Sequence, residues 1–133
     1  METIVRIKIL SDLLSPEEIT SRLGSKPDRV WHKGNVREIS RNMAKFNGWI
    51  MDAGSSRQAP IKEQVAMLLE KLKPLRTELN EIAALASVDL SIVVYSDYEP
   101  PLHFDNATLG EIASLGANLD IDLYIRTNDG EGS

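Results

Sequence analysis

Two distant segments of the chain, residues 4–33 and 88–125, share one pattern. Each begins with alternating β-branched residues, passes through Ser-Asp, enters a short amphipathic stretch and leaves it at Leu-Gly. Each then returns through a segment that contains Asp to a second strand-like run. A period of two indicates a strand with one buried face, and apolar residues three and four apart indicate a helix. The sequence therefore predicts two related β-α-β units in one sheet.

Local signals mark both short helices. Ser15 followed by Glu18 forms a capping box, and Gly24 suits the left-handed conformation that ends many helices. Asp105, Asn106 or Thr108 could cap the helix of the second unit. We expect Leu109, Ile112 and Leu115 to form the buried stripe of this helix and Gly116 to end it.

Between the two units, residues 61–86 carry the longest helical pattern. An interior proline removes a backbone donor and clashes with the preceding turn, at a cost of about 3 kcal/mol. We therefore expect a break near Lys73, with Pro74 opening a second helical segment. So short and interrupted a segment favours an apolar stripe lying on the sheet over a coiled-coil dimer. The stripe consists of Ile61, Val65, Leu68, Leu72, Leu75, Leu79 and Ile82.

Together these elements predict an α+β domain, a two-layer sandwich with a mainly antiparallel sheet and helices packed on one face. Trp31 and Trp49 should lie on paired antiparallel strands, since a turn signal precedes Trp49. The first strand exposes Arg6 and Lys8, and the last strand, residues 119–125, exposes acidic residues. Because opposite charges on facing strands are stabilising, we expect these two strands to be neighbours.

The length of 133 residues suits one domain, which we place at residues 1–126, followed by a flexible acidic tail at 127–133. The chain contains no apolar run near twenty residues long and no secretory signal pattern, so we expect no membrane span and a cytoplasmic location. Cysteine is absent, which excludes disulfides and thiolate chemistry.

Charge is segregated along the chain, whose formal net charge is −5. Residues 22–45 contain seven cationic and two acidic residues, whereas residues 89–133 contain nine acidic residues and one cation. Such an arrangement is either a pair of solvated faces or a surface that orients a partner.

Signs of catalysis are weak. Only two histidines occur, and neither has a metal-binding spacing. The acids Asp97, Glu99 and Asp105 suit a magnesium or calcium site in type, but no EF-hand pattern is present. Phosphate-binding glycine motifs and nucleophile motifs are also absent. We predict no metal site, no cofactor and no catalytic residue.

The most unusual local cluster is Trp-His-Lys-Gly at residues 31–34. One interpretation places Trp31 in the core and Lys33 in solvent. The other is a recognition rim beside the basic segment, because aromatic and cationic groups are frequent anchors of interfaces. The tentative binding residues are Trp31, His32, Lys33, Arg37, Arg41, Asp97, Glu99 and His103.

The order of these landmarks resembles a bacterial family of small proteins, the domain of unknown function numbered 4279. The resemblance is carried by the capping-box helix from Ser15 to Gly24, Trp31-His-Lys-Gly34, Gly48-Trp49, the leucine-rich helix and the closing run from Leu115 to Tyr124. It implies a cytoplasmic bacterial single domain, and it assigns no catalytic residue.

We interpret the chain as a protein-binding module, monomeric or homodimeric, more readily than as an enzyme. One specific form is an immunity-type inhibitor that blocks a toxin or nuclease with its acidic C-terminal half. The first alternative is an enzyme or small anionic-ligand binder that uses Trp31 to Lys33 with Arg37 and Arg41. The second is nucleic-acid binding through residues 22–45, which the acidic pI of about 5.0 disfavours.

Overall fold

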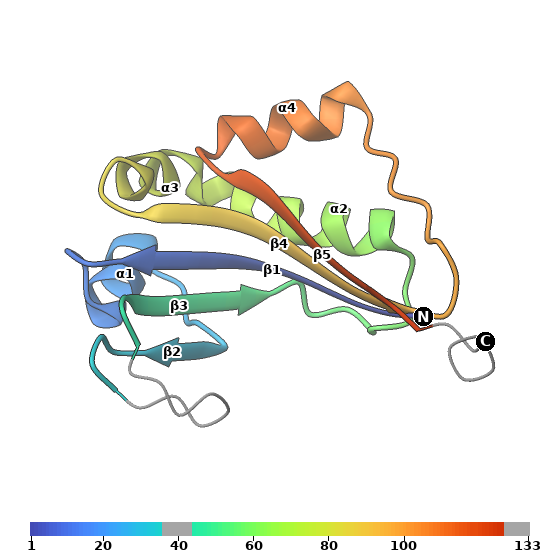
Figure 1. Ribbon diagram of the computed structural model, residues 1–133. Coiled ribbons are helices and arrows are strands. Elements are labelled where there is room, and N and C mark those ends of the chain that lie inside the picture. The colour runs from blue at the N-terminus through green and yellow to red at the C-terminus, as the bar shows by residue number, and fades with distance from the viewer. Residues whose placement is uncertain (36–43, 127–133) are drawn as a thin grey trace.

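The computed structural model describes residues 1–35 and 44–126 (Figure 1). Arg37, Arg41 and the tail at 127–133 therefore lie outside the described residues. The elements in chain order are β1 (Glu2–Ser11), α1 (Pro16–Leu23), β2 (Arg29–Trp31), β3 (Asn47–Asp52), α2 (Ile61–Leu72), the 3₁₀ turn η1 (Lys73–Leu75), α3 (Arg76–Ala83), β4 (Ser87–Ser96), α4 (Asn106–Ser114) and β5 (Asn118–Ile125).

The five strands form one mixed sheet in the order β2-β3-β1-β4-β5. β1 is antiparallel to both β3 and β4, β2 is antiparallel to β3, and β5 is parallel to β4. The first four strands with α1 and the α2–α3 segment thus have the β-α-β-β-α-β arrangement of split β-α-β folds. The α4–β5 unit extends this sheet by one parallel strand.

Both predicted β-α-β units are present, and they differ in one respect. β4 and β5 are parallel neighbours joined through α4. β1 and β2 are also parallel, but β3 lies between them. The antiparallel pairing predicted for the two tryptophan strands is confirmed, with Val30 opposite Trp49 and Trp31 opposite Gly48.

The predicted pairing of the first and last strands is wrong, because β4 lies between β1 and β5. The short connection through α4 places β5 directly beside β4, whose other edge pairs with β1. The cations of β1 instead face acids on nearer strands. Arg6 Nε lies 3.4 Å from Asp52 Oδ1 on β3, and Lys8 is opposite Asp89 on β4.

The helices follow their sequence signals. The Ser15 hydroxyl accepts a hydrogen bond from the Glu18 N–H, and the Glu18 carboxylate accepts one from the Ser15 N–H, so the capping box is complete. Asp105 caps α4 by accepting a hydrogen bond from the Thr108 N–H. The break predicted at Pro74 is the 3₁₀ turn between α2 and α3.

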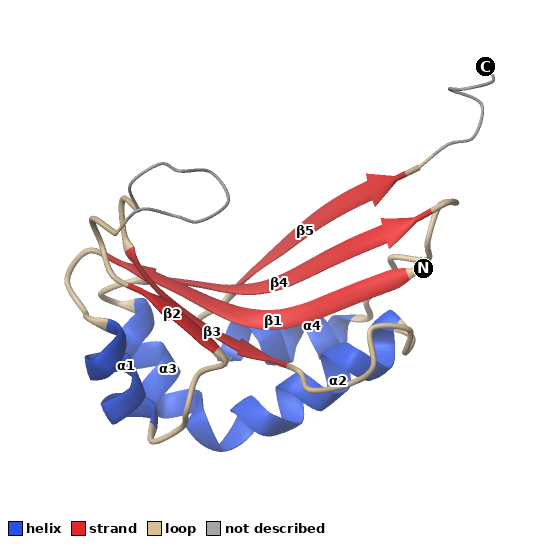
Figure 2. Ribbon diagram, turned by 90° about the horizontal axis from the view of Figure 1, so that it is seen from below, coloured by secondary structure: helices blue, strands red, loops and turns tan. Residues whose placement is uncertain are grey.

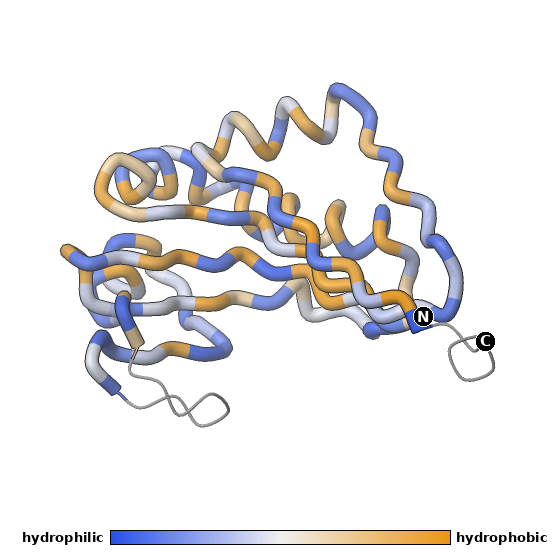
Figure 3. The backbone as a smooth tube through the Cα atoms, in the orientation of Figure 1, coloured by the Kyte–Doolittle hydropathy of each residue, from blue (hydrophilic) through white to orange (hydrophobic). Residues whose placement is uncertain are grey.

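All helices lie on one side of the sheet (Figure 2). Hydropathy alternates along the central strands, so one face of each is apolar (Figure 3). The core forms between this face and the helices, with Trp49, Ile7, Ile9, Leu68 and Leu72 among its fully buried members. No described element covers the opposite side of the sheet, which we call the open face.

One expectation for α4 is not met. Ile112 and Leu115 are buried, but Leu109, predicted to complete the buried stripe, is 43% exposed. The C-terminal end of the helix packs most closely, because the Asn80 amide on α3 donates to the Ser114 carbonyl oxygen at 2.7 Å. None of the helices in residues 1–35 and 44–126 has the length and apolar composition to cross a bilayer.

Replacing Gly48 by Ala should destabilise the fold, because its Cβ would lie only 2.1 to 2.5 Å from three ring carbons of Trp31. Forcing extra carbon into a packed site costs about 1–3 kcal/mol. The matched control is Gly110→Ala in α4, where nothing lies within 4 Å of the added Cβ. Alanine there should raise the free energy of unfolding by roughly 0.5–1 kcal/mol, since glycine is a poor helix former. Urea unfolding measures both effects, and equal stability of the two variants would contradict the contact.

Candidate functional site

The Trp31–Lys33 cluster lies where β2 ends. Trp31 is half-buried on the open face, outside the core cluster, and its ring lies against Gly48. The guanidinium carbon of Arg29 lies 5.6 Å from the ring centroid, a cation–π distance. The absence of a side chain at Gly48 is therefore what lets the indole ring lie so close to the backbone of β3.

The two polar members of this cluster bind carboxylates of the same chain. His32 Nε2 lies 2.9 and 3.0 Å from the two carboxylate oxygens of Glu17 on α1. Lys33 Nζ donates to Asp12 Oδ1 at 2.9 Å. The hydrogen bond with His32 is the main cause that holds the pKa of Glu17 below its ordinary value of 4.5. An anionic ligand here would have to compete with both carboxylates.

The other predicted residues lie elsewhere. Asp97 follows the C-terminal end of β4, and its Oδ1 lies 3.4 Å from Arg126 Nε. Glu99 and His103 are exposed on the segment between β4 and α4. The C-terminal end of β2 lies near Ser11, the last residue of β1. The C-terminal end of β4 lies near Glu2, the first residue of β1. Among the described residues, the structure therefore separates Trp31 to Lys33 from Asp97, and the two lie at opposite ends of β1.

A carboxylate metal site is not assembled from these acids. Within the described residues, no three His, Asp or Glu side chains are grouped closely enough to hold a metal ion. Asp105 accepts the capping hydrogen bond of α4, which lowers its pKa below the ordinary value of 3.8. Its role in the structure is that of a helix cap.

A shallow hollow of about 480 Å³ lies beside the C-terminal end of β4. Asp97 and Arg126 belong to its lining, with Met1, Glu2, Ile4, Arg57, Tyr95 and Ser96. Beside it on the open face, the rings of Tyr95 and Tyr124 stack with centroids 5.2 Å apart. This pair was not predicted from the sequence, although a parallel register of β4 and β5 places the two tyrosines side by side.

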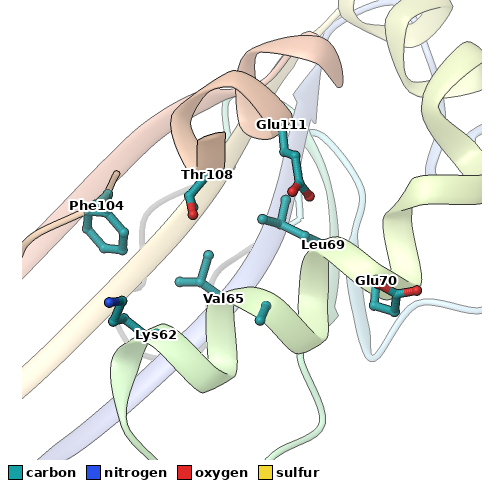
Figure 4. A pocket seen from close by; sticks show the side chains of 8 residues that line it. Lys62, Val65, Leu69, Glu70, Phe104, Thr108 and Glu111 are labelled. Atoms are coloured by element: carbon teal, nitrogen blue, oxygen red, sulfur yellow. The ribbon is translucent and has the colours of Figure 1, made fainter. Parts of the chain in front are cut away.

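A groove between α2 and α4 was also missed (Figure 4). Its volume is about 270 Å³, and Lys62, Val65 and Leu69 on α2 face Thr108 and Glu111 on α4. An adjoining hollow of about 190 Å³ continues it toward Arg76. The groove exists because α4 stands off from α2, a spacing that no local sequence signal encodes.

Two acidic residues of β5 lie on the open face. Asp120 and Asp122 project from β5 and are exposed, and within the described residues neither forms an ion pair. Tyr124 on the same side of β5 is 54% exposed. This surface, which we call the β5 surface, also includes Leu123 and Ile125, which lie on the other side of the strand and are 40% and 39% exposed.

Replacing Glu17 by Gln should lower stability above pH 4.5 and have less effect in acid. A carboxyl group whose pKa is lowered on folding stabilises the native state when ionised, and this stabilisation is lost as pH falls through the lowered pKa. The difference between the wild-type and Glu17→Gln urea midpoints should therefore shrink between pH 6 and pH 3. In a His32→Ala background the pKa of Glu17, measured by NMR titration, should move up toward 4.5. A midpoint difference that grows in acid would contradict the Glu17–His32 pair.

Comparison with known protein families identifies the family of this chain. The profile of DUF4279, a domain of unknown function, matches residues 1–126. Comparison with the curated proteins and with the solved structures found no match. Because the matched range spans nearly the whole chain, the protein belongs to the DUF4279 family.

Proposed function

We propose that this protein is a non-catalytic protein-binding module whose partner contacts the β5 surface. The observation that carries the proposal is the combination at β5 of two exposed, unpaired aspartates with Leu123, Tyr124 and Ile125, all exposed by about two-fifths or more. Exposed apolar groups bordered by polar residues mark interaction sites. Aromatic residues are enriched in such sites.

The charge pattern supports a cationic partner. The cations of β1 already face Asp52 and Asp89 on β3 and β4, so they contribute little net field of their own. Asp120 and Asp122 have no such compensation within the described residues, and like-sign surfaces steer partners of opposite charge. A specific form of the proposal is an immunity-type inhibitor of a bacterial toxin or nuclease, because nuclease sites that bind phosphate backbones are cationic.

The rival hypotheses have less support. The cations proposed to bind an anion, His32 and Lys33, contact Glu17 and Asp12. Neither His32 nor His103 is among the residues that line the three hollows described above. The rest of the anion hypothesis depends on Arg37 and Arg41, which lie outside the described residues.

Co-purification from the native host, with tagged protein, tests the proposal. Wild type should retain one protein in roughly stoichiometric amount, and Asp120→Lys/Asp122→Lys should lower the retained amount about tenfold, since reversing charges at an interface weakens association. The matched control is Glu70→Lys/Glu81→Lys, which changes the net charge equally at exposed positions near the C-terminal ends of α2 and α3, where cations are tolerated.

Thermal unfolding of all three proteins first establishes that each is folded. Retention of the partner by wild type and control, with loss in the β5 variant, supports the proposal. The absence of a stoichiometric partner would contradict protein binding. Equal loss in both variants would assign the effect to total charge and contradict the role of β5.

A further inference from the structure

The two edges of the sheet differ. β2 closes one edge with three residues, and β5 forms the other with eight. Within residues 1–35 and 44–126, no hydrogen bond reaches the outer edge of β5. A long edge strand presents a row of unpaired N–H and C=O groups, which is a template for another strand.

The direction of these groups follows from one contact. The Arg126 N–H donates to the Ser96 carbonyl oxygen of β4 at 2.8 Å, continuing the parallel ladder without a bulge. Backbone groups of successive residues in a strand point to opposite edges. Asp120, Asp122 and Tyr124 therefore pair with β4, and the N–H and C=O groups that point outward belong to the apolar residues Leu119, Ile121, Leu123 and Ile125.

The two sides of β5 present different chemistry to an added strand. Asp120 and Asp122 lie on the open face, in register with Ser91 and Val93 of β4. Leu123 and Ile125 lie on the side of the helices, but they remain exposed because the buried residues of α4 are Ile112 and its neighbour Leu115, near the other end of β5. Figure 1 shows the last part of β5 extending beyond α4.

A second copy of the chain paired about Ile121 is a poor occupant of this edge. If two β5 strands paired in antiparallel fashion about Ile121, Asp120 of each would face Asp122 of the other. Like charges directly opposite each other are destabilising. A strand with cations at those positions would instead form opposite-charge pairs, and apolar residues in alternation with them would cover Leu123 and Ile125.

We infer that β5 is a strand-addition site that accepts an extended segment of a partner protein in which apolar and basic side chains alternate. The inference rests on the proposed function and specifies its mode of binding. Main-chain hydrogen bonds to the outward groups of Leu119, Ile121 and Leu123 supply the pairing. Contacts with Asp120 and Asp122 select the basic side chains.

A synthetic peptide of alternating valine and lysine, eight residues long and blocked at both ends, tests the mode directly. Its binding to the full chain is measured by calorimetry at low ionic strength. The controls are of three kinds: an alternating valine–glutamate peptide, a peptide with four lysines followed by four valines, and the alternating peptide with every second backbone nitrogen methylated. The last removes one row of donors while keeping both side-chain types. Both methylated registers are made, because either edge of the peptide can pair.

We expect the alternating valine–lysine peptide to bind. The valine–glutamate peptide, the block peptide and the peptide methylated on its pairing edge should each bind at least tenfold more weakly. The peptide methylated on its other edge keeps the pairing donors and is exempt from this loss. Asp120→Lys/Asp122→Lys should weaken binding of the alternating peptide at least tenfold, and Glu70→Lys/Glu81→Lys should change it less than twofold. Amide hydrogen exchange of Leu119, Ile121 and Leu123 should slow when the peptide binds.

Other results overturn the inference. Equal binding of the block peptide, or of both methylated registers, would show attraction to charge without strand pairing. Absence of binding by all peptides would reject this class of ligand. Sedimentation that gives a dimer of the 14.8 kDa chain with protected β5 amides would make a second copy the occupant. If co-purification yields a partner whose loss follows Asp120 and Asp122 while these tests fail, the proposed function stands and only the strand-addition mode is wrong.

Discussion

The alternation of buried and half-exposed residues along β1 is the constraint on which the rest of the structure depends. Val5, Ile7 and Ile9 are essentially fully buried under the helices, and Arg6 and Lys8 between them lie on the open face. Because side chains alternate strictly, a slip of one residue would place two cations in the core. This fixes the register with β3 and β4 at once, and thereby the positions of all five strands.

The same register determines how charge is distributed. The cations of β1 face Asp52 and Asp89 on the two flanking strands, so the centre of the open face is close to neutral. β5 lies one strand farther out, and among the described strands it has a neighbour on only one side. Its two aspartates and its outward backbone groups are both left without partners in the described part of the chain. Charge and unpaired backbone coincide on one strand for this geometric reason.

Much of the fold could be predicted from the sequence because its signals are local. The capping box at Ser15, the break at Pro74 and the alternation in the strands each depend on residues a few positions apart. The neighbours of the last strand could not be predicted from charge. Asp120 and Asp122 match Arg6 and Lys8 in sign, but a short connection through α4 requires β5 to lie beside β4. The same limit applies to the candidate site. Trp31 to Lys33 could be singled out from their residue types alone, whereas the exposure of Leu123 and Ile125 depends on how far α4 extends along β5.

In the described part of the chain, β5 has one edge paired with β4 and one edge free. Residue-resolved amide hydrogen exchange of the free protein tests it most directly. We expect alternating protection along β5, with slow exchange at Asp120, Asp122 and Tyr124 and fast exchange at Leu119, Ile121 and Leu123. Uniformly slow exchange along the strand would show that its outer edge is already paired, and would rule out a free edge at β5.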